Sequence, residues 1–276
     1  MKQTIITADV LDNTEIAPGI FRMGIHYPEA ADRVRPGQFF NIYPDADRLI
    51  LPRPFGVHAA DRREQVIYLI YEVTGEGTRE MAEKSKGAKV RVSGPLGNGF
   101  DLQEAREGAA RENRQAPVQT VLIGGGVGTS VLQLLAEELL AAGTEVTAVL
   151  GFRKHPFGAE ELRKTGARVL VSTDLPQEGV YHGNVCGCME HYGVTGDLYF
   201  ACGPRPMLKA VDEYVRTHGD DRALQVSLES RMACGYGVCL GCSTPMLEEQ
   251  ENGQEMIVRK RVCKDGPVFR GNEVVW

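Results

Sequence analysis

Four cysteines near the end of the chain constrain its fold more than any other feature of the sequence. Cys234, Cys239 and Cys242 follow the spacing C-x4-C-x2-C, and Cys263 comes after twenty further residues. A 2Fe–2S cluster takes three thiolates from one tight loop and a fourth from a returning segment. The glycines between these cysteines favour such a loop, because glycine lets the backbone approach a cluster closely. We therefore predict that the four cysteines hold a 2Fe–2S cluster.

A structural zinc site is the alternative for the same cysteines. Zinc sites usually divide their cysteines into two C-x2-C-like pairs, whereas this chain places three in one loop. The chain has seven cysteines in all, and the residues after Met1 do not resemble an export signal. Because disulfide frameworks belong to exported proteins, we expect reduced thiols and a cytoplasmic location.

Size and charge exclude several other classes of protein. A chain of 276 residues is too long for one small core and predicts two or three modules. Its 31 Lys and Arg against 37 Asp and Glu give a net charge of −6, so no basic field attracts nucleic acid. No apolar run approaches the length that spans a bilayer. We expect neither nucleic acid nor a membrane as a partner.

Short β-rich runs separated by Pro-Gly and Gly turns occupy the first hundred residues, which is typical of an antiparallel β-barrel. We predict this barrel over residues 1–102, with a helix at Thr78–Lys86 crossing it. The expected strands are Thr4–Val10, Ile20–Ile25, Gln38–Tyr43, Gln65–Val73 and Lys89–Val92.

Two segments of the expected barrel carry chemistry suited to FAD. The first, Arg53-Pro54-Phe55-Gly56, offers a cation for a phosphate beside an aromatic face that can cover a flavin ring. In the second, a strand ending in Ile70-Tyr71-Glu72 leads to Gly77 and Thr78 at a helix N-terminus, where N–H groups favour a pyrophosphate. Each segment alone is commonly a surface arginine or a tight turn. Both on one barrel predict an FAD site.

After a polar linker at residues 103–117, strands and helices alternate. The strand Gln119–Ile123 runs into a glycine turn, and the helix Val131–Ala142 and the strand Glu145–Leu150 follow. This order indicates an α/β nucleotide-binding domain with a parallel sheet, which we place at residues 118–226. Later elements are expected at Val169–Val171, Leu198–Ala201 and Met207–Thr217. The remaining residues, 227–276, form a small cluster module.

Two turns of this domain are the expected contacts for a nicotinamide nucleotide. Thr129 stands where the dinucleotide fingerprint has its third glycine, and no acidic residue for a ribose follows the second strand. Cys202 ends a strand where a nicotinamide would lie, although a buried free cysteine is the alternative. The expected contacts are Gly124, Gly126, Gly128, Thr129, Cys202 and Gly203.

In this order, the motifs resemble those of the ferredoxin-reductase family. The short cysteine module narrows the resemblance to the electron-transfer subunits of NAD-linked (class 1B) dihydroorotate dehydrogenases, and the resemblance covers nearly the whole chain. In that family an Arg-Pro-x-Ser segment and the strand before Gly-x-Gly-Thr hold FAD. Carried over, this implies Arg53, Pro54, Phe55, Gly56, Ile70, Tyr71, Glu72, Gly77 and Thr78 for FAD and Cys234, Cys239, Cys242 and Cys263 for the cluster.

The chain departs from the family pattern in four places. Gly56 stands where a serine or threonine hydroxyl often faces the flavin, and Val131 replaces a frequent proline. The loop Ser172–Gly183 lacks the usual Asp-Gly-Ser sequence, and the gap between Cys242 and Cys263 is longer than usual.

The resemblance implies a role in electron transfer. A partner subunit carrying FMN would oxidise dihydroorotate to orotate in pyrimidine biosynthesis, in a heterotetramer of two of each chain. Electrons would pass between that FMN and NAD through the cluster and FAD, because only a flavin exchanges electrons both in pairs and singly. We find no catalytic acid or base for a separate substrate. We expect NADH to be preferred to NADPH, and partner contact at Met232 to Cys242 and near Trp276.

Two other functions fit the same motifs. The small subunit of an NADPH–ferredoxin oxidoreductase or of a sulfide dehydrogenase would differ in its partner and its nucleotide. A redox sensor or a zinc-stabilised binding module would be colourless and would contain zinc.

Overall fold

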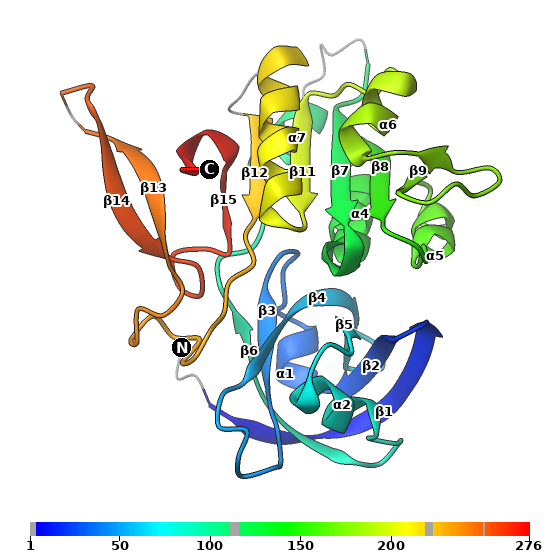
Figure 1. The fold of residues 1–276 in the computed structure, drawn as a ribbon, viewed down its shortest axis with the longest axis vertical. Coiled ribbons are helices and arrows are strands. Elements are labelled where there is room, and N and C mark those ends of the chain that lie inside the picture. The colour runs from blue at the N-terminus through cyan, green and yellow to red at the C-terminus, as the bar shows by residue number, and fades with distance from the viewer. Residues whose placement is uncertain (1–3, 111–115, 219–222, 251) are drawn as a thin grey trace.

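The computed structural model describes residues 4–110, 116–218, 223–250 and 252–276. A β-barrel lies at one end of the molecule and an α/β domain at the other (Figure 1). The C-terminal segment, drawn in orange and red, runs beside both of them. Three parts of the sequence thus meet along one side of the molecule.

Six antiparallel strands close into the barrel. They are β1 (Ile6–Ala17), β2 (Ile20–His26), β3 (Phe39–Tyr43), β4 (Arg53–Asp61), β5 (Val66–Glu72) and β6 (Lys89–Leu96). Their order around the barrel is β1-β2-β5-β4-β3-β6. The short helices α1 (Pro28–Ala31) and α2 (Glu76–Ala82) pack on the barrel core through Ala30, Ala31 and Met81. The expected barrel is confirmed.

The barrel differs from the sequence-based expectation in three elements. The strand β4 was not expected, because Pro54 and Gly56 are rare in strands. Pro54 lies in the part of β4 that pairs with β3 only, so its missing N–H breaks no ladder with β5. The first strand runs on to Ala17 rather than ending at Val10, and the expected helix at Thr78–Lys86 is α2, which begins and ends earlier.

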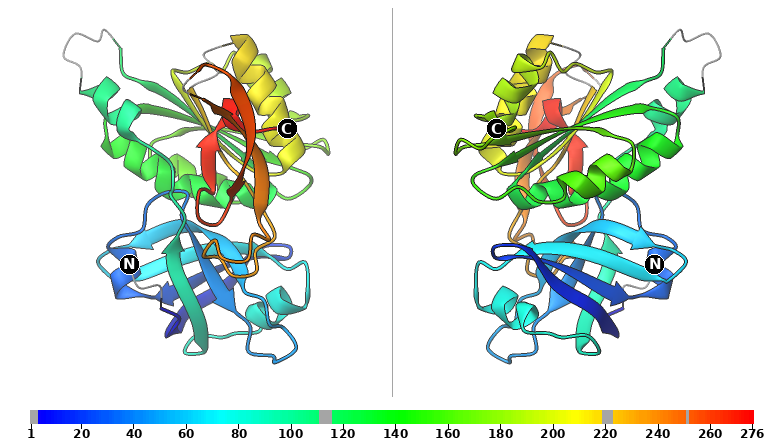
Figure 2. Two further views of the ribbon diagram at one scale, coloured as in Figure 1. Left: turned by 90° about the vertical axis from the view of Figure 1, so that its left-hand side faces the viewer. Right: turned by 90° about the vertical axis from the view of Figure 1, so that its right-hand side faces the viewer.

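The α/β domain contains a sheet whose strands are parallel apart from the last. Its strands are β7 (Gln119–Gly125), β8 (Glu145–Phe152), β9 (Arg168–Thr173), β10 (Tyr181–His182), β11 (Leu198–Cys202) and β12 (Leu224–Ser227). Its helices are α3 (Gln103–Ala109), α4 (Leu132–Ala141), α5 (Ala159–Lys164), α6 (Val185–His191), α7 (Arg205–His218) and the 3-10 turn η1 (Gly126–Val131). Helices cover both faces of the sheet (Figure 2).

The order of strands places a switch point beside β7. The sheet runs β10-β9-β8-β7-β11-β12 and continues into β15 (Val268–Arg270), so the chain leaves β7 toward β8 and later returns on its other side as β11. Ligands of parallel sheets bind at such points, beyond the carboxyl ends of the strands. The expected linker begins as α3, and its residues 111–115 lie outside the described part of the chain.

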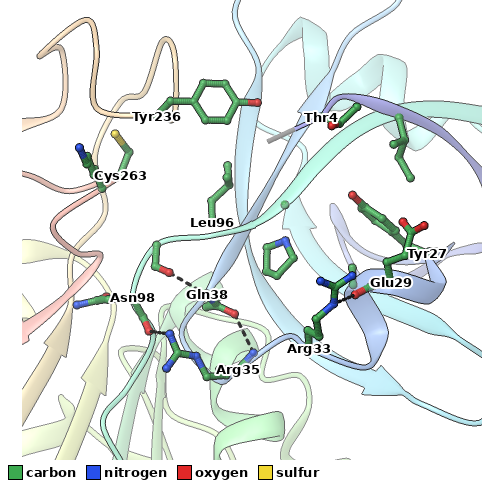
Figure 3. Close-up of a pocket in the computed structure, with 17 residues that line it drawn as sticks. Thr4, Tyr27, Glu29, Arg33, Arg35, Gln38, Leu96, Asn98, Tyr236 and Cys263 are labelled. Carbon is green, nitrogen blue, oxygen red and sulfur yellow. Dashed lines mark hydrogen bonds between the residues drawn. The ribbon is translucent and has the colours of Figure 1, made fainter. Parts of the chain in front are cut away.

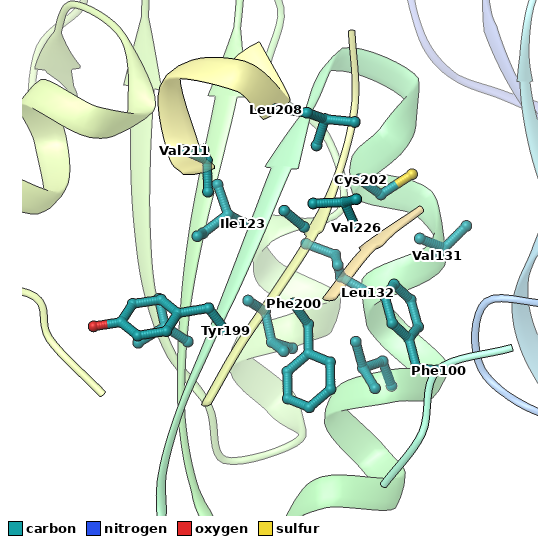
Figure 4. Close-up of a cluster of buried hydrophobic side chains, with 14 of the residues drawn as sticks. Phe100, Ile123, Val131, Leu132, Tyr199, Phe200, Cys202, Leu208, Val211 and Val226 are labelled. Carbon is teal, nitrogen blue, oxygen red and sulfur yellow. The ribbon is translucent and has the colours of Figure 1, made fainter. Parts of the chain in front are cut away.

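One continuous core joins the domains. Phe100, which follows the barrel, packs edge-on against Phe200 of β11 with ring centroids 5.7 Å apart (Figure 4). Ile20, Phe39 and Ile70 of the barrel belong to the same buried cluster. The domains are therefore held together by apolar packing as well as by the chain that links them.

The C-terminal segment is bound to the sheet of the α/β domain. The hairpin β13 (Ser243–Glu249) and β14 (Glu255–Arg261) occupies the long gap between Cys242 and Cys263. β15 then pairs antiparallel with β12 and ends in the 3-10 turn η3 (Gly271–Glu273). No helix in the described ranges is long and apolar enough to cross a membrane.

We predict that Trp276→Phe lowers the free energy of unfolding by about 1–2 kcal/mol, since a hydrogen bond to a charged group is lost. Trp276 Nε1 donates to Asp212 Oδ2 of α7 at 3.0 Å, and Asp212 is buried. Urea unfolding followed by far-UV circular dichroism measures the change. In an Asp212→Asn background, Trp276→Phe should lower the free energy of unfolding by less. An equal decrease in both backgrounds would contradict the prediction.

Candidate functional site

A cleft of about 650 Å³ lies between the barrel and the carboxyl ends of the parallel strands. Glu72, at the end of β5, lines it from the barrel. Gly125 and Gly151 line it from β7 and β8, and Glu229 lines it from the segment that leads to the first cysteine. The cleft therefore joins the three parts of the chain where the sequence predicts their cofactors.

Arg53 and Gly77 of the expected FAD site lie against each other. A Cβ atom at Gly77 would overlap the Arg53 guanidinium, so only glycine allows the arginine to reach the first turn of α2. The Thr78 hydroxyl accepts the N–H groups of Thr74 and Gly75 at 3.0 and 3.1 Å and thereby caps this helix. A cation and the free N–H groups of a first helical turn thus meet, which suits a phosphate.

The second FAD segment follows the alternation of a strand. Ile70 packs toward the α/β domain and Glu72 lines the cleft, whereas Tyr71 is fully buried on the opposite side. The Tyr71 hydroxyl donates to Asn13 Oδ1 at 2.9 Å, and burial raises the pKa of Tyr71 to about 12. Tyr71 can therefore offer a cofactor its backbone but not its hydroxyl, while its ring supports Phe55 at 5.6 Å.

Two departures from the family pattern contact each other. A Cβ atom at Gly56 would overlap Cγ1 of Val131, at the end of η1. Phe55 and Gly56 therefore lie beside the glycine turn of the α/β domain. The loss of a side chain at position 56 makes room for valine at position 131.

The two expected nucleotide-binding turns pack on each other at the switch point. A Cβ atom at Gly128 would lie 2.6 Å from the carbonyl oxygen of Cys202 and 2.7 Å from Gly203 Cα. Gly126 has φ +54°, and the Thr129 hydroxyl donates to its carbonyl oxygen at 2.8 Å. The backbone of both turns can thus approach a dinucleotide closely.

The Cys202 side chain takes no direct part in this cleft. It is 4% exposed and lies in the core beside Val131 and Val226 (Figure 4). Burial and the charge of Glu229 raise the pKa of the Cys202 thiol to about 12, so it stays protonated. The interpretation as a buried free cysteine therefore holds for the Cys202 side chain. The Cys202 backbone still forms part of the expected nucleotide-binding turn.

Sequence reasoning missed Asp174 and Glu229. Asp174 directly follows β9, is exposed and lines the cleft with Arg153 and Lys154. An acidic residue just after a parallel strand is the signal for it, but Asp174 follows the third strand, β9, and not the second, β8, where the dinucleotide fingerprint places the acid that binds the ribose. Glu229 follows β12, whose four residues were too few to be recognised as a strand.

The four cysteines of the expected cluster lie as two neighbouring pairs, Cys234 with Cys239 and Cys242 with Cys263. Among the residues that the structure describes, no three His, Cys, Asp or Glu side chains converge on one metal ion. Two pairs suit a cluster of two irons better than one tetrahedral zinc ion.

Backbone N–H groups point at all four sulfur atoms. The donors and their distances are Tyr236 to Cys234 at 3.3 Å, Gly237 to Cys263 at 3.1 Å, Gly241 to Cys239 at 3.5 Å and Cys263 to Cys242 at 3.4 Å. Burial opposes ionisation of Cys234, but N–H groups of the loop outweigh it and lower its pKa to about 6. Burial and the paired Cys242 raise the pKa of Cys263 to about 12. The N–H groups of the loop thus favour the thiolate at Cys234, the form that binds metal, whereas burial favours the neutral thiol at Cys263.

The cluster loop is asymmetric. Cys242 and Cys263 are 3% and 2% exposed, whereas Cys239 is exposed between Val238 and Leu240, which are 81% and 61% exposed. Leu240 has φ +59°, which a leucine rarely adopts. One pair of thiols therefore faces the protein and the other reaches an apolar tip.

A wider cavity of about 870 Å³ separates the loop from the far side of the barrel. Arg35, Gln38 and Asn98 line it opposite Tyr236 and Cys263 (Figure 3). Cys263 is the only residue of the expected cofactor sites that borders this cavity, whereas Glu72 and Gly126 of those sites line the interdomain cleft.

We predict that Gly56→Ser lowers the FAD content and destabilises the protein by about 1–3 kcal/mol, the usual cost of overpacking. Its Cβ overlaps Val131 and forces the barrel away from the glycine turn. Flavin stoichiometry and thermal unfolding measure both effects. In the double variant, Val131→Ala should recover much of the FAD content and of the stability that Gly56→Ser loses. If the double variant loses as much as Gly56→Ser alone, the two positions are independent.

Comparisons with known proteins agree with this geometry. Residues 229–275 match the model for the iron–sulfur cluster binding domain of dihydroorotate dehydrogenase B. The chain is 33% identical over 269 residues to the dihydroorotate dehydrogenase B (NAD(+)) electron transfer subunit of Listeria monocytogenes serotype 4a, with 96% of each chain covered. It is 35% identical over 271 residues to that of Streptococcus pneumoniae strain R6, with 98% of each covered.

Among solved structures, a chain of the NADH-dependent reduced ferredoxin-NADP oxidoreductase superposes with a TM-score of 0.80. It is 28% identical, and the match covers all of this chain and 92% of the other. The similarity over whole chains, together with the matched cluster domain, shows the family. The chain belongs to the electron transfer subunits of dihydroorotate dehydrogenase B.

Proposed function

We propose that this chain carries electrons between NAD and the FMN of a catalytic dihydroorotate dehydrogenase subunit, and so supports the oxidation of dihydroorotate to orotate in pyrimidine biosynthesis. The observation that carries the proposal is the interdomain cleft, where residues of the barrel, the nucleotide turns and Glu229, five residues before Cys234, line one space. The relatives' names supply the substrate and the partner. We keep the cytoplasm as the proposed location, because cysteines must stay reduced to bind iron.

The barrel binds and orients the flavin in this proposal. Arg53 and the first turn of α2 bind the FAD phosphates, and Phe55, supported by Tyr71, covers the ring. Gly56 has no hydroxyl, so its backbone N–H serves in place of the usual side chain. FAD, when bound, accepts a hydride and releases its electrons one at a time.

The α/β domain brings the nicotinamide to that ring. Gly124, Gly126, Gly128 and Thr129 let the backbone approach the pyrophosphate, and the Cys202–Gly203 backbone closes the cleft behind the nicotinamide. Asp174 accepts a hydrogen bond from a ribose hydroxyl and repels a 2′-phosphate, which supports NADH over NADPH. Arg153 and Lys154 line the same cleft, and their positive charges attract a 2′-phosphate and so favour NADPH.

The cluster loop exchanges electrons with the partner. Cys239 lies at the exposed apolar tip between Val238 and Leu240, and we propose that this tip docks on the FMN subunit in a heterotetramer of two of each chain. Trp276 is held on α7 by Asp212 and Arg205, away from this tip, so the proposed interface is now limited to the loop.

A second candidate is the small subunit of an NADPH–ferredoxin oxidoreductase. The superposition at a TM-score of 0.80 favours it, but the 28% identity lies below that to the dihydroorotate dehydrogenase B relatives. The two candidates require different partners. Mass spectrometry of the complex purified from its source organism therefore distinguishes them.

We predict that the purified chain contains FAD and about two irons, and that Cys239→Ser removes the iron but leaves FAD bound. Cys239 is exposed, so the substitution disturbs no packing. With NADH the wild-type chain should reduce artificial acceptors but leave dihydroorotate unchanged. With an FMN-containing catalytic subunit it should support NAD⁺-dependent orotate formation, and Cys239→Ser should abolish this coupling.

Cys186→Ser is the matched control, because Cys186 is a half-buried cysteine of α6 outside the cluster. It should keep both the iron and the coupling. Zinc in place of iron, or orotate formation by the chain alone, would refute the proposal.

We predict that NADH reduces the FAD more efficiently than NADPH, and that Asp174→Ser narrows the preference by roughly tenfold, about 1.4 kcal/mol. The serine removes the charge that repels a 2′-phosphate. Stopped-flow measurement of flavin reduction gives the two rates. Glu178→Gln, which alters a nearby exposed carboxylate, is the control and should change neither the rate with NADH nor the rate with NADPH. Equal rates with both nucleotides in the wild-type chain would contradict the proposed preference for NADH.

A further inference from the structure

Asn41 lies in the middle of β3 and is fully buried, with 0% of its surface exposed. Neither its Nδ2 nor its Oδ1 atom has a hydrogen-bond partner among the residues that the structure describes. A buried amide without partners is destabilising, and native proteins seldom contain one. The burial of this amide therefore points to a partner that is not a protein atom.

The Asn41 amide faces the cluster loop. Gly235 directly follows the ligand Cys234 and has φ +73°. A Cβ atom at Gly235 would overlap Nδ2 of Asn41. The amide nitrogen thus contacts the stretch of backbone that carries Cys234.

Neighbouring polar groups already bond to one another. The Tyr236 hydroxyl lies 2.9 Å from Ser93 Oγ and 3.1 Å from the Tyr43 hydroxyl, so these three groups form their own network. The Tyr236 N–H donates to Cys234 Sγ at 3.3 Å. What remains beside Gly235 is an amide donor without a partner, next to the backbone that leads to Cys234.

We propose that Asn41 is a positioning residue for the 2Fe–2S cluster, and that its Nδ2–H donates a hydrogen bond to a cluster sulfur beside Gly235. The inference rests on the proposed function, since it requires the cluster. Reduction adds negative charge to the sulfurs, so a hydrogen bond to sulfur stabilises the reduced state more than the oxidised state. Asn41 therefore raises the reduction potential of the cluster.

The position of Asn41 places this bond on the flavin side of the cluster. Asn41 pairs with Pro54 of β4 and with Ser93 of β6 in the barrel sheet. Pro54 belongs to the segment assigned to FAD. A single strand, β3, thus links that segment to the cluster loop, so the bond lies on the side of the cluster where electrons pass between the cluster and FAD.

Asn41→Leu tests the inference, because leucine has a similar volume and no donor. The midpoint potential of the cluster in the holoprotein, measured by redox titration with electron paramagnetic resonance, should become more negative. We expect about a tenfold change in the equilibrium constant for one-electron reduction, which corresponds to about 59 mV. The FAD content of the same samples should not change.

A second variant and a direct measurement support this test. Asn41→Asp keeps the shape of the side chain but replaces the donor by a negative charge, so it should lower the potential further. Electron–nuclear double resonance on protein whose asparagine side chains carry nitrogen-15 should show coupling to the reduced cluster. That coupling should be absent from Asn41→Leu.

Tyr43→Phe is the matched control, because it removes a hydroxyl that joins the barrel to the same loop without touching Gly235. Its potential should equal that of the wild-type protein. An unchanged potential and coupling in Asn41→Leu would overturn the inference, and so would an equal shift in Tyr43→Phe. Absence of iron from the wild-type protein would refute the proposed function, and the inference with it.

Discussion

At Gly56 the barrel approaches the α/β domain so closely that a Cβ atom would overlap Val131. The same kind of contact recurs where the cluster loop meets the barrel, at Gly235 and Asn41, and where the two nucleotide turns meet, at Gly128 and Cys202. Each contact requires the absence of a side chain. The distances between the proposed flavin, nucleotide and cluster sites depend on these approaches, since any larger residue would separate the parts that they join.

The C-terminal segment holds the cluster loop from its other side. The Arg261 guanidinium donates to both carboxylate oxygens of Asp265 at 2.9 Å, and also to the Gly237 carbonyl oxygen at 3.0 Å. Gly237 in turn donates its N–H to Cys263. The hairpin that lengthens the gap between Cys242 and Cys263 ends at Arg261, so the insertion supplies this brace rather than loosening the loop. β15 then anchors the returning segment to the sheet.

Burial divides the cluster loop into two faces with different roles. The pair Cys242 and Cys263 is buried, while Cys239 reaches the surface beside Leu240. Solvent exposure and hydrogen bonds to sulfur both affect the potential of a cluster. In the proposed path the partner therefore meets the exposed face at Cys239, and FAD lies on the side of the loop where Asn41 contacts Gly235.

The sequence alone determined the barrel, the parallel sheet and the four cysteines, because strand periodicity, turn residues and ligand spacing are local properties. It did not reveal β4 or β12, since Pro54 and Gly56 conceal one strand and the other has four residues. It also did not reveal that Tyr71 and the Cys202 side chain point away from the cleft, that Asp174 and Glu229 line it, or that Asn41 lies against Gly235 of the cluster loop. Only the tertiary structure decided these points, because burial and contact depend on which distant segments pack against a residue.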